Sequence, residues 1–455
     1  MISQKLCKVG ILSLGCPRNL VDSESILGRL NLKGYPIVDL EQADVAIVNT
    51  CAFIEDAKKE SIGALLDLIA LKKEGRLKKI IVYGCLAQRY KYTLAREFPE
   101  IDAFIGKVSF PASVSTMQAG SRLLSKIDWR ENHNGRFPLT PSHFTYLKIC
   151  EGCVNHCSYC VIPRIKGRFA SLEMDSVLEK AEKFNRDKVS EINIIGQDIS
   201  GYGLDLYKKP RLTELLRKIV KVADNVPWIR LLYLYPSRVS DELIELIKDE
   251  PRICRYIDLP LQHINDRILK LMRRSSAKKD ILKLVDKIRK KIPAVAIRTA
   301  FIVGFPSETE AEFRELLGFI RDARLERLGA FIYSREEGTE AFSFKQQLPD
   351  KVKAERFGAV MSAQQEISRA INKNFLGKTL EVLIDACENG TYLGRSQYDA
   401  PEVDGLVYVH PVRKDDCKEA KFSNGVNSKN KLKPGDLVKV KITDTLEYDL
   451  VGESL

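Results

Sequence analysis

The sequence predicts an α/β protein in three parts: an N-terminal parallel α/β domain, a central partial barrel of six βα units, and a small C-terminal β-barrel. Short β-rich runs alternate with amphipathic helical stretches over the first 110 residues and again from Phe144 to about Phe331. Beyond residue 376, short strand-like runs are separated by Gly, Asn and Pro instead. At 455 residues the chain is long enough for several domains, each with its own apolar core.

The N-terminal domain, expected over residues 5–118, shows the βαβ pattern of a parallel sheet. Strands are expected at 8–14, 43–49 and 79–83, and helices at 20–30, 54–73 and 92–97. Each strand leads directly into a cysteine, namely Cys16, Cys51 or Cys85. The carboxyl ends of parallel strands meet at one edge of a sheet, so these thiols can converge although they lie 35 and 34 residues apart.

The central domain is expected at residues 143–375, after a linker at 119–142 that loses periodicity and gathers Gly, Asn and Pro. Its six strand candidates are FTYLKIC, EINIIGQDI, IRLLYLYP, RYIDLPL, VAIRTAFIVGFP and LGAFIYS. Six βα units favour a barrel over a doubly wound sheet, and barrel enzymes place their chemistry at the carboxyl ends of the strands. A helical stretch at 352–374 then precedes the C-terminal domain at 376–455.

Composition indicates a soluble globular protein, with 44% apolar and 29% charged residues. No apolar run approaches the roughly 18 residues of a membrane-spanning helix, and the protein is expected in the cytoplasm. The cytosol keeps thiols reduced, so the eleven cysteines are expected to serve metal binding or catalysis rather than disulfides. The net charge of +12 suggests an anionic or nucleic-acid partner, although solvated lysines on helix faces explain it equally well.

The densest group of cysteines is CEGCVNHCSYC at residues 150–160. All four could bind zinc or an iron-sulfur cluster together, but the spacer between the two pairs is too short for a folded-back tetrahedral zinc site. Cys153, Cys157 and Cys160 have C-x3-C-x2-C spacing. Three thiolates on a 4Fe-4S cluster leave one iron open to a substrate, so these three are predicted as ligands. Cys150 ends a strand and is expected to be a bystander that packs as a small apolar side chain, with a fourth cluster ligand or a redox role as the alternative.

C-x3-C-x2-C spacing at the end of the first strand of a βα barrel resembles the radical S-adenosylmethionine (radical SAM) superfamily. The resemblance implies that the amino and carboxylate groups of S-adenosylmethionine chelate the open iron. It also implies that an electron from the cluster cleaves the cofactor to a 5′-deoxyadenosyl radical, with Cys153, Cys157 and Cys160 as the catalytic ligands.

The order of the three domains is similar to the methylthiotransferases over essentially the whole chain, with a TRAM-like barrel at the C-terminus. The resemblance implies that Cys16, Cys51 and Cys85 hold a second, auxiliary 4Fe-4S cluster, which carries the sulfur that ends on the substrate. The remaining cysteines are scattered singly and are expected to be ordinary core or surface thiols: Cys7, Cys254, Cys387 and Cys417.

Four motifs resemble the protein-modifying branch of this family, the RimO type, rather than the branch that modifies a tRNA adenosine. They are SLGCPRNLVDSE at 13–24, GQDIS at 196–200, YSREEGT at 333–339 and RSQYDAPEVDG at 395–405. This branch implies methylthiolation at the β-carbon of an aspartate in small-subunit ribosomal protein twelve. The family usually shows an arginine-flanked serine after the cluster loop, and this chain departs from that pattern with KGRFASL.

Charge distribution supports the same substrate class. Residues 378–455 contain eleven Lys and Arg against fourteen Asp and Glu, a net charge of −3, which leaves +15 on the rest of the chain. Phosphate neutralisation supplies most nucleic-acid affinity, so an acidic terminal barrel suits a basic ribosomal protein better than tRNA. The expected partners are therefore the ribosomal protein and an electron donor such as flavodoxin or ferredoxin, without a membrane or tRNA.

Four further residues are predicted to contact cofactor or substrate in the barrel. Gln197 and Asp198 lie at the carboxyl end of the second strand, Arg298 lies within the fifth, and Gly304 ends the fifth. A structural role is the alternative for each of them. Two alternatives remain for the whole chain: tRNA methylthiolation, and a non-catalytic iron-sulfur or RNA-binding protein.

Overall fold

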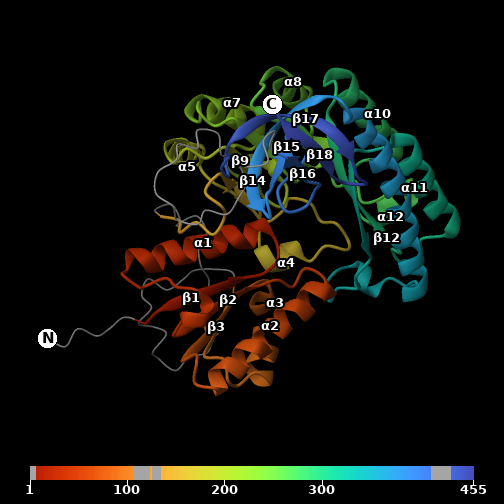
Figure 1. The fold of residues 1–455 in the computed structure, drawn as a ribbon. Helices are drawn as coiled ribbons and strands as arrows, with labels where there is room; N and C mark the ends of the chain where they lie inside the picture. The colour runs from red at the N-terminus through yellow and green to blue at the C-terminus, as the bar shows by residue number, and fades with distance from the viewer. Residues whose placement is uncertain (1–6, 107–122, 125–134, 411–431) are drawn as a thin grey trace, which may run out of the picture. The chain divides into compact units, whose positions relative to one another are not determined.

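The computed structural model describes residues 7–106, 123–124, 135–410 and 432–455, and these form two compact units (Figure 1). The first unit comprises residues 1–139, 150–176 and 334–342, and the second comprises 140–149, 177–333 and 343–455. The cysteine-rich loop and a short segment after the sixth barrel strand thus belong to the first unit. Of the expected linker, only residues 123–124 and 135–142 lie within the described residues, and Cys417 lies outside them.

The first unit contains a parallel sheet in the order β1-β2-β3-β4-β5. Its strands are β1 (Val9–Ser13), β2 (Val45–Thr50), β3 (Lys79–Gly84), β4 (Ala103–Ile105) and β5 (Leu123–Leu124). Its three long helices are α1 (Pro17–Leu32), α2 (Glu55–Lys73) and α3 (Cys85–Glu97). The predicted βα alternation is confirmed, and the third helix begins at the cysteine itself rather than at residue 92.

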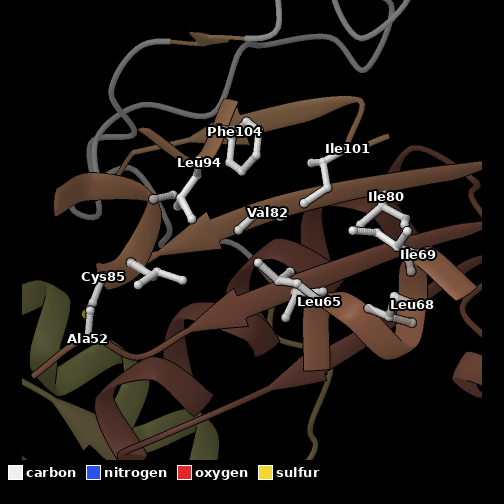
Figure 2. Close-up of a cluster of buried hydrophobic side chains, with 14 of the residues drawn as sticks. Ala52, Leu65, Leu68, Ile69, Ile80, Val82, Cys85, Leu94, Ile101 and Phe104 are labelled. Atoms are coloured by element: carbon white, nitrogen blue, oxygen red, sulfur yellow. The ribbon is translucent and has the colours of Figure 1, made fainter. Parts of the chain in front are cut away.

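Helices cover both faces of this sheet because its strands are apolar on both sides. On one face, Ile26 and Leu30 of α1 pack against the sheet. On the other, Leu65, Leu68 and Ile69 of α2 pack with residues of β3, β4 and α3, as Figure 2 shows. The sheet is therefore buried on both sides, and its carboxyl edge carries the polar and thiol groups.

The cysteine-rich loop is anchored in the core of the same unit. Cys150 and Glu151 form β7, which pairs antiparallel with β8 (Ala170–Ser171). Between them lies the short helix α4 (Ile162–Lys166), whose Ile165 is 1% exposed and belongs to the apolar cluster of Figure 2, with Val161. The loop thus has a fixed place beside the N-terminal domain.

The second unit contains six parallel strands in the order β13-β12-β11-β10-β9-β6, which is an open, partial barrel sheet. The strands are β6 (Phe144–Lys148), β9 (Glu191–Ile195), β10 (Trp228–Leu231), β11 (Ile253–Asp258), β12 (Ala296–Val303) and β13 (Arg327–Ile332). The helices between and after them are α5 (Met174–Arg186), α6 (Leu204–Tyr207), α7 (Leu212–Val222), α8 (Asp241–Asp249), α9 (Asp266–Leu271), α10 (Lys278–Lys291), α11 (Glu310–Ala323) and α12 (Asp350–Asn372). All six predicted strands are present.

The C-terminal residues close into a five-stranded barrel in the order β14-β15-β16-β18-β17. Its strands are β14 (Thr379–Glu388), β15 (Thr391–Ser396), β16 (Val407–His410), β17 (Leu437–Thr445) and β18 (Leu450–Ser454). Because the barrel is closed, β14 also pairs with β17, and none of the five described strands is left with an unpaired edge. Buried Val, Ile, Leu and Tyr side chains fill the interior. Among the described residues, no helix is both long and apolar enough to cross a bilayer.

Candidate active site

The three N-terminal cysteines lie at the carboxyl edge of the first sheet. Cys16 is the N-cap of α1 after β1, Cys51 follows β2, and Cys85 is the first residue of α3 after β3. The three strands are neighbours in register, because Asn49 pairs with both Ser13 and Tyr83. The parallel register of adjacent strands therefore carries all three cysteines to the same edge of the sheet; that they share a cluster stays a prediction.

Two glycines let the backbone approach closely at this edge. Gly15 has a φ of +87°, and a Cβ there would lie 2.7 Å from the Cβ of Cys51 and 3.0 Å from its Sγ. Gly84 has a φ of +105°, and a Cβ there would lie 2.5 Å from Asn49 Oδ1. Any other residue would both strain the backbone and push on the neighbouring strand end. The Gly-Cys pairs at 15–16 and 84–85 were therefore a readable signal for this site.

Two buried asparagines, which sequence reasoning missed, hold the strand ends together. Asn19 Nδ2 donates to the carbonyl oxygens of Leu14 (3.0 Å) and Thr50 (3.2 Å). Asn49 Nδ2 donates to Asn19 O (2.7 Å) and Ser23 Oγ (2.9 Å). Both asparagines are fully buried. Buried amides require such partners, and here the partners fix the loops that carry the thiols.

Positive charge surrounds the first of these thiols. Arg18 Nε donates to Cys16 Sγ at 3.4 Å. Burial raises the pKa of Cys16, but the charges of Arg18 and Lys166 outweigh it and lower the pKa to about 7. For Cys51, burial and the neighbouring Cys85 raise the pKa to about 11. A bound cation would favour the thiolate of each cysteine, and Cys16 already has more thiolate character than Cys51.

The second group of cysteines lies in the loop after β6. Cys160 N donates to Cys157 O at 3.1 Å in a turn, and Cys153 Sγ accepts from both the backbone N (3.4 Å) and Nδ2 (3.3 Å) of Asn155. Burial, Cys157 and Cys153 raise the pKa of Cys160 to about 12, while Arg18 acts in the opposite direction. The charge of Arg18 acts to lower the pKa of both Cys16 and Cys160. Both cysteine groups therefore lie near this arginine in the first unit.

Cys150 differs from the other three cysteines of the run. It is fully buried in β7 opposite Ser171, whereas Cys153, Cys157 and Cys160 are partly exposed. This placement is that of the expected bystander, and its role stays a prediction. No disulfide joins any two cysteines in the described part of the chain. Of the single cysteines there, Cys254 is buried and Cys7 and Cys387 are exposed.

The segment KGRFASL, residues 166–172, in which the chain departs from the family pattern, is buried at its C-terminal end. Ala170, Ser171 and Leu172 are buried, and the first two form the strand opposite Cys150. Lys166, whose side chain is only 2% exposed, lies 3.1 Å from Glu151 Oε1 and 3.7 Å from Asp22 Oδ2. The lysine charge is thus compensated inside the first unit, beside the N-terminal thiols.

The donor set fits iron-sulfur clusters. Each group offers three thiols, with N–H···S bonds and nearby positive charge that favour thiolates. In the part of the chain that the structure describes, no three His, Cys, Asp or Glu side chains converge tightly enough to surround a single metal ion. A cluster binds each thiolate at a different iron atom, so its ligands lie farther apart than those of a single metal ion.

The four barrel residues predicted as contacts occupy different places in the second unit. Gln197 and Asp198 follow the carboxyl end of β9, and Asp198 is an N-cap that also pairs with Arg238. Gly304 follows β12 with a φ of +74°. Arg298 instead lies near the amino-terminal end of β12, where it pairs with Asp258 and Asp404. Their roles toward a cofactor stay predictions.

Comparison with known proteins identifies the chain. Residues 8–106 match the uncharacterized protein family UPF0004, residues 147–320 the radical SAM superfamily, and residues 376–455 the TRAM domain. The ribosomal protein uS12 methylthiotransferase RimO of Thermoanaerobacter sp. (strain X514) is 46% identical over 98% of this chain and 99% of its own. The RimO proteins of Caldanaerobacter subterraneus subsp. tengcongensis and Clostridioides difficile (strain 630) are 47% and 43% identical, again at nearly full length.

The chain belongs to the RimO family of radical SAM methylthiotransferases. Its fold is also similar to that of a solved radical SAM methyltransferase, TsrM from Kitasatospora setae, with a TM-score of 0.53 and 14% identity over 88% of this chain and 82% of that one. The cobalamin-dependent radical enzyme OxsB gives a TM-score of 0.51 at 12% identity, over 78% of this chain and 56% of that one. The predicted fold class, enzyme class and RimO assignment are confirmed, and the tRNA alternative is not favoured.

Proposed function

We propose that this chain methylthiolates the β-carbon of an aspartate in ribosomal protein uS12. Its RimO relatives are named for that substrate. The observation that carries the proposal is that two groups of three cysteines lie in one compact unit, with Arg18 close enough to influence both. Sulfur transfer of this kind requires a sulfur source and a radical source at one site.

Two 4Fe-4S clusters and S-adenosylmethionine are the cofactors. When bound, the cluster held by Cys153, Cys157 and Cys160 supplies the electron that generates the radical, and the cluster held by Cys16, Cys51 and Cys85 supplies the sulfur. An aspartyl β-carbon has no proton acidic enough for a side-chain base, so polar chemistry cannot place sulfur there. Radical chemistry avoids this barrier.

The chain itself supplies placement and electrostatics. Gly15 and Gly84 let the strand ends approach each other, and Asn19 and Asn49 hold those ends. Arg18 places a guanidinium beside Cys16, where it favours a thiolate. These groups fix the geometry before the cofactors react.

The enzyme works in the cytoplasm on uS12, with reducing equivalents from a donor such as flavodoxin or ferredoxin. The acidic C-terminal barrel suits a basic ribosomal protein.

The test is mass spectrometry on cells with and without the gene, which compares tryptic peptides of uS12 with nucleosides of total tRNA. We expect the methylthio mass on the uS12 aspartate to disappear with the gene. Loss from a tRNA adenosine, with the aspartate unchanged, would refute the substrate while leaving the radical chemistry intact.

A further inference from the structure

A carboxylate of the YSREEGT motif is buried in the first unit. Glu336 is 2% exposed, and its Oε2 lies 2.8 Å from Arg89 Nη1 and 3.2 Å from Lys58 Nζ. Its Oε1 accepts from Ser334 Oγ at 2.6 Å. A buried charge persists only when it is paired and hydrogen-bonded, and here both oxygens have partners. Glu336 therefore bonds the segment after β13 to the N-terminal domain.

The partner arginine connects this carboxylate to two N-terminal cysteine positions. Arg89 lies in α3, four residues after Cys85, and its Nη1 also donates to Ala52 O at 2.7 Å, directly beyond Cys51. Its Nη2 donates to Glu337 O at 3.1 Å. The Arg89 side chain is 6% exposed, and its guanidinium group thus connects the loop after Cys51, the helix that begins at Cys85 and the 334–342 segment.

The other end of the same segment contacts the cysteine-rich loop. Ala341 N donates to Ser158 O at 2.8 Å, and Ser158 lies between Cys157 and Cys160. Gly338, at a φ of +81°, allows close approach to Arg164, just beyond that loop. From Glu336 to Ala341 the chain can extend at most about 17 Å. The segment therefore limits how far the two cysteine groups can separate.

We infer that Glu336 is a positioning residue: through Arg89 and the segment 334–342, it fixes the two cysteine groups at the separation that sulfur transfer requires. The inference rests on the function proposed above and adds a role for the YSREEGT motif. Because the contacts of Glu336 are with Arg89, Lys58 and Ser334 rather than with Cys153, Cys157 or Cys160, its loss should uncouple radical formation from product rather than abolish both.

Glu336→Gln is the sharpest perturbation, because it keeps the shape of the side chain, removes the charge that holds Arg89 and Lys58, and replaces one acceptor oxygen by an NH2 donor. Glu337→Gln is the matched control, since the neighbouring side chain is exposed and only its carbonyl oxygen contacts Arg89. A misplacement of about 1 Å in a reacting geometry can cost roughly a hundredfold in rate. We expect methylthiolated uS12 per 5′-deoxyadenosine to fall about tenfold to a hundredfold in Glu336→Gln and to stay unchanged in the control.

The assay uses the reconstituted full chain with S-adenosylmethionine, a chemical reductant and uS12, and it counts both products in the same tube. Absence of methylthiolated uS12 with the unaltered enzyme would refute the proposed function. An unaltered enzyme that works, with the same product ratio in Glu336→Gln, would overturn the positioning role. A parallel fall of both products would overturn it as well, because the whole site would then be lost.

A second measurement needs no cofactor. Hydrogen exchange on the metal-free chain reports the amide of Ala341, which bonds to Ser158, and the amide of Glu55, which donates to Ser334 Oγ at 3.4 Å. We expect both amides to exchange faster in Glu336→Gln than in Glu337→Gln. Equal exchange in the two variants would show that Glu336 does not hold the segment.

Discussion

A buried ion network in the second unit permits a quantitative prediction. Glu191, the first residue of β9, is fully buried between two buried arginines. Its Oε1 lies 2.7 Å from Arg230 Nε, and its Oε2 lies 2.7 Å from Arg395 Nη1. Arg230 belongs to the barrel sheet and Arg395 to the C-terminal barrel, so the carboxylate joins the two. We consider the substitution Glu191→Gln.

The expected cost follows from what remains after the change. Removing one partner of a buried ion pair typically costs about 3–5 kcal/mol, because the other charge stays buried without compensation. Here two guanidinium groups would lose their shared carboxylate, although Arg395 keeps Asp385 at 2.7 and 2.9 Å. For a unit of this size, about 2 °C per kcal/mol predicts a melting temperature lower by roughly 6–10 °C.

The effect should depend on pH. Burial raises the pKa of Glu191, but Arg395 and Arg230 outweigh it and hold the pKa below its usual value. A carboxyl group with a depressed folded pKa stabilises the protein above its unfolded pKa of about 4.3, and this contribution is lost as the pH falls through the folded value. The difference in melting temperature between the parent and Glu191→Gln should therefore be largest near neutral pH and should become smaller in acid.

The assay is thermal and urea unfolding of the metal-free chain between pH 3 and 8, conditions chosen to span the titration. Glu381→Gln, on an exposed position of β14, is the control and should change stability by less than about 0.5 kcal/mol. If Glu191→Gln melts within 2 °C of this control at neutral pH, or if the gap widens in acid, the reasoning is wrong.

Three further predictions concern the cysteine groups. Gly15→Ala should lower the iron content of the reconstituted chain toward half, because its Cβ would press on Cys51 at 2.7 Å; an unchanged iron assay would refute this. Cys153→Ala should abolish S-adenosylmethionine cleavage while Cys150→Ala leaves it largely intact, as measured by 5′-deoxyadenosine; loss in both would return Cys150 to the ligands. Asn19→Ala, which removes bonds to Leu14 and Thr50, should destabilise the apo chain by about 1–3 kcal/mol in urea unfolding, and a neutral effect would contradict its role.

Patterns of neighbouring residues in the sequence were enough to predict the strands, the cysteine groups and the family of this protein. The period of the apolar runs indicated the strands of both parallel sheets, and the cysteine spacing indicated the second thiol group, because both signals reside in adjacent residues. The strand-to-cysteine junctions also predicted that Cys16, Cys51 and Cys85 meet at one edge, since parallel register carries strand ends to the same side. Together with four motifs, these features were enough to reach the family.

Only the tertiary structure decided which distant groups are partners. The sequence places Arg298 within a strand but does not show its partners, which the structure identifies as Asp258, the last residue of β11, and Asp404 of the C-terminal domain; its role toward a cofactor stays a prediction. Glu336 was visible only as part of a motif, and its bonds to Arg89 and Lys58 span more than 240 residues of chain. The partner of a buried charge is the opposite charge that folding places next to it, and no periodicity in the sequence predicts which residue that is. The sequence by itself therefore determined the elements and the thiol chemistry, and packing decided how the two thiol groups are held.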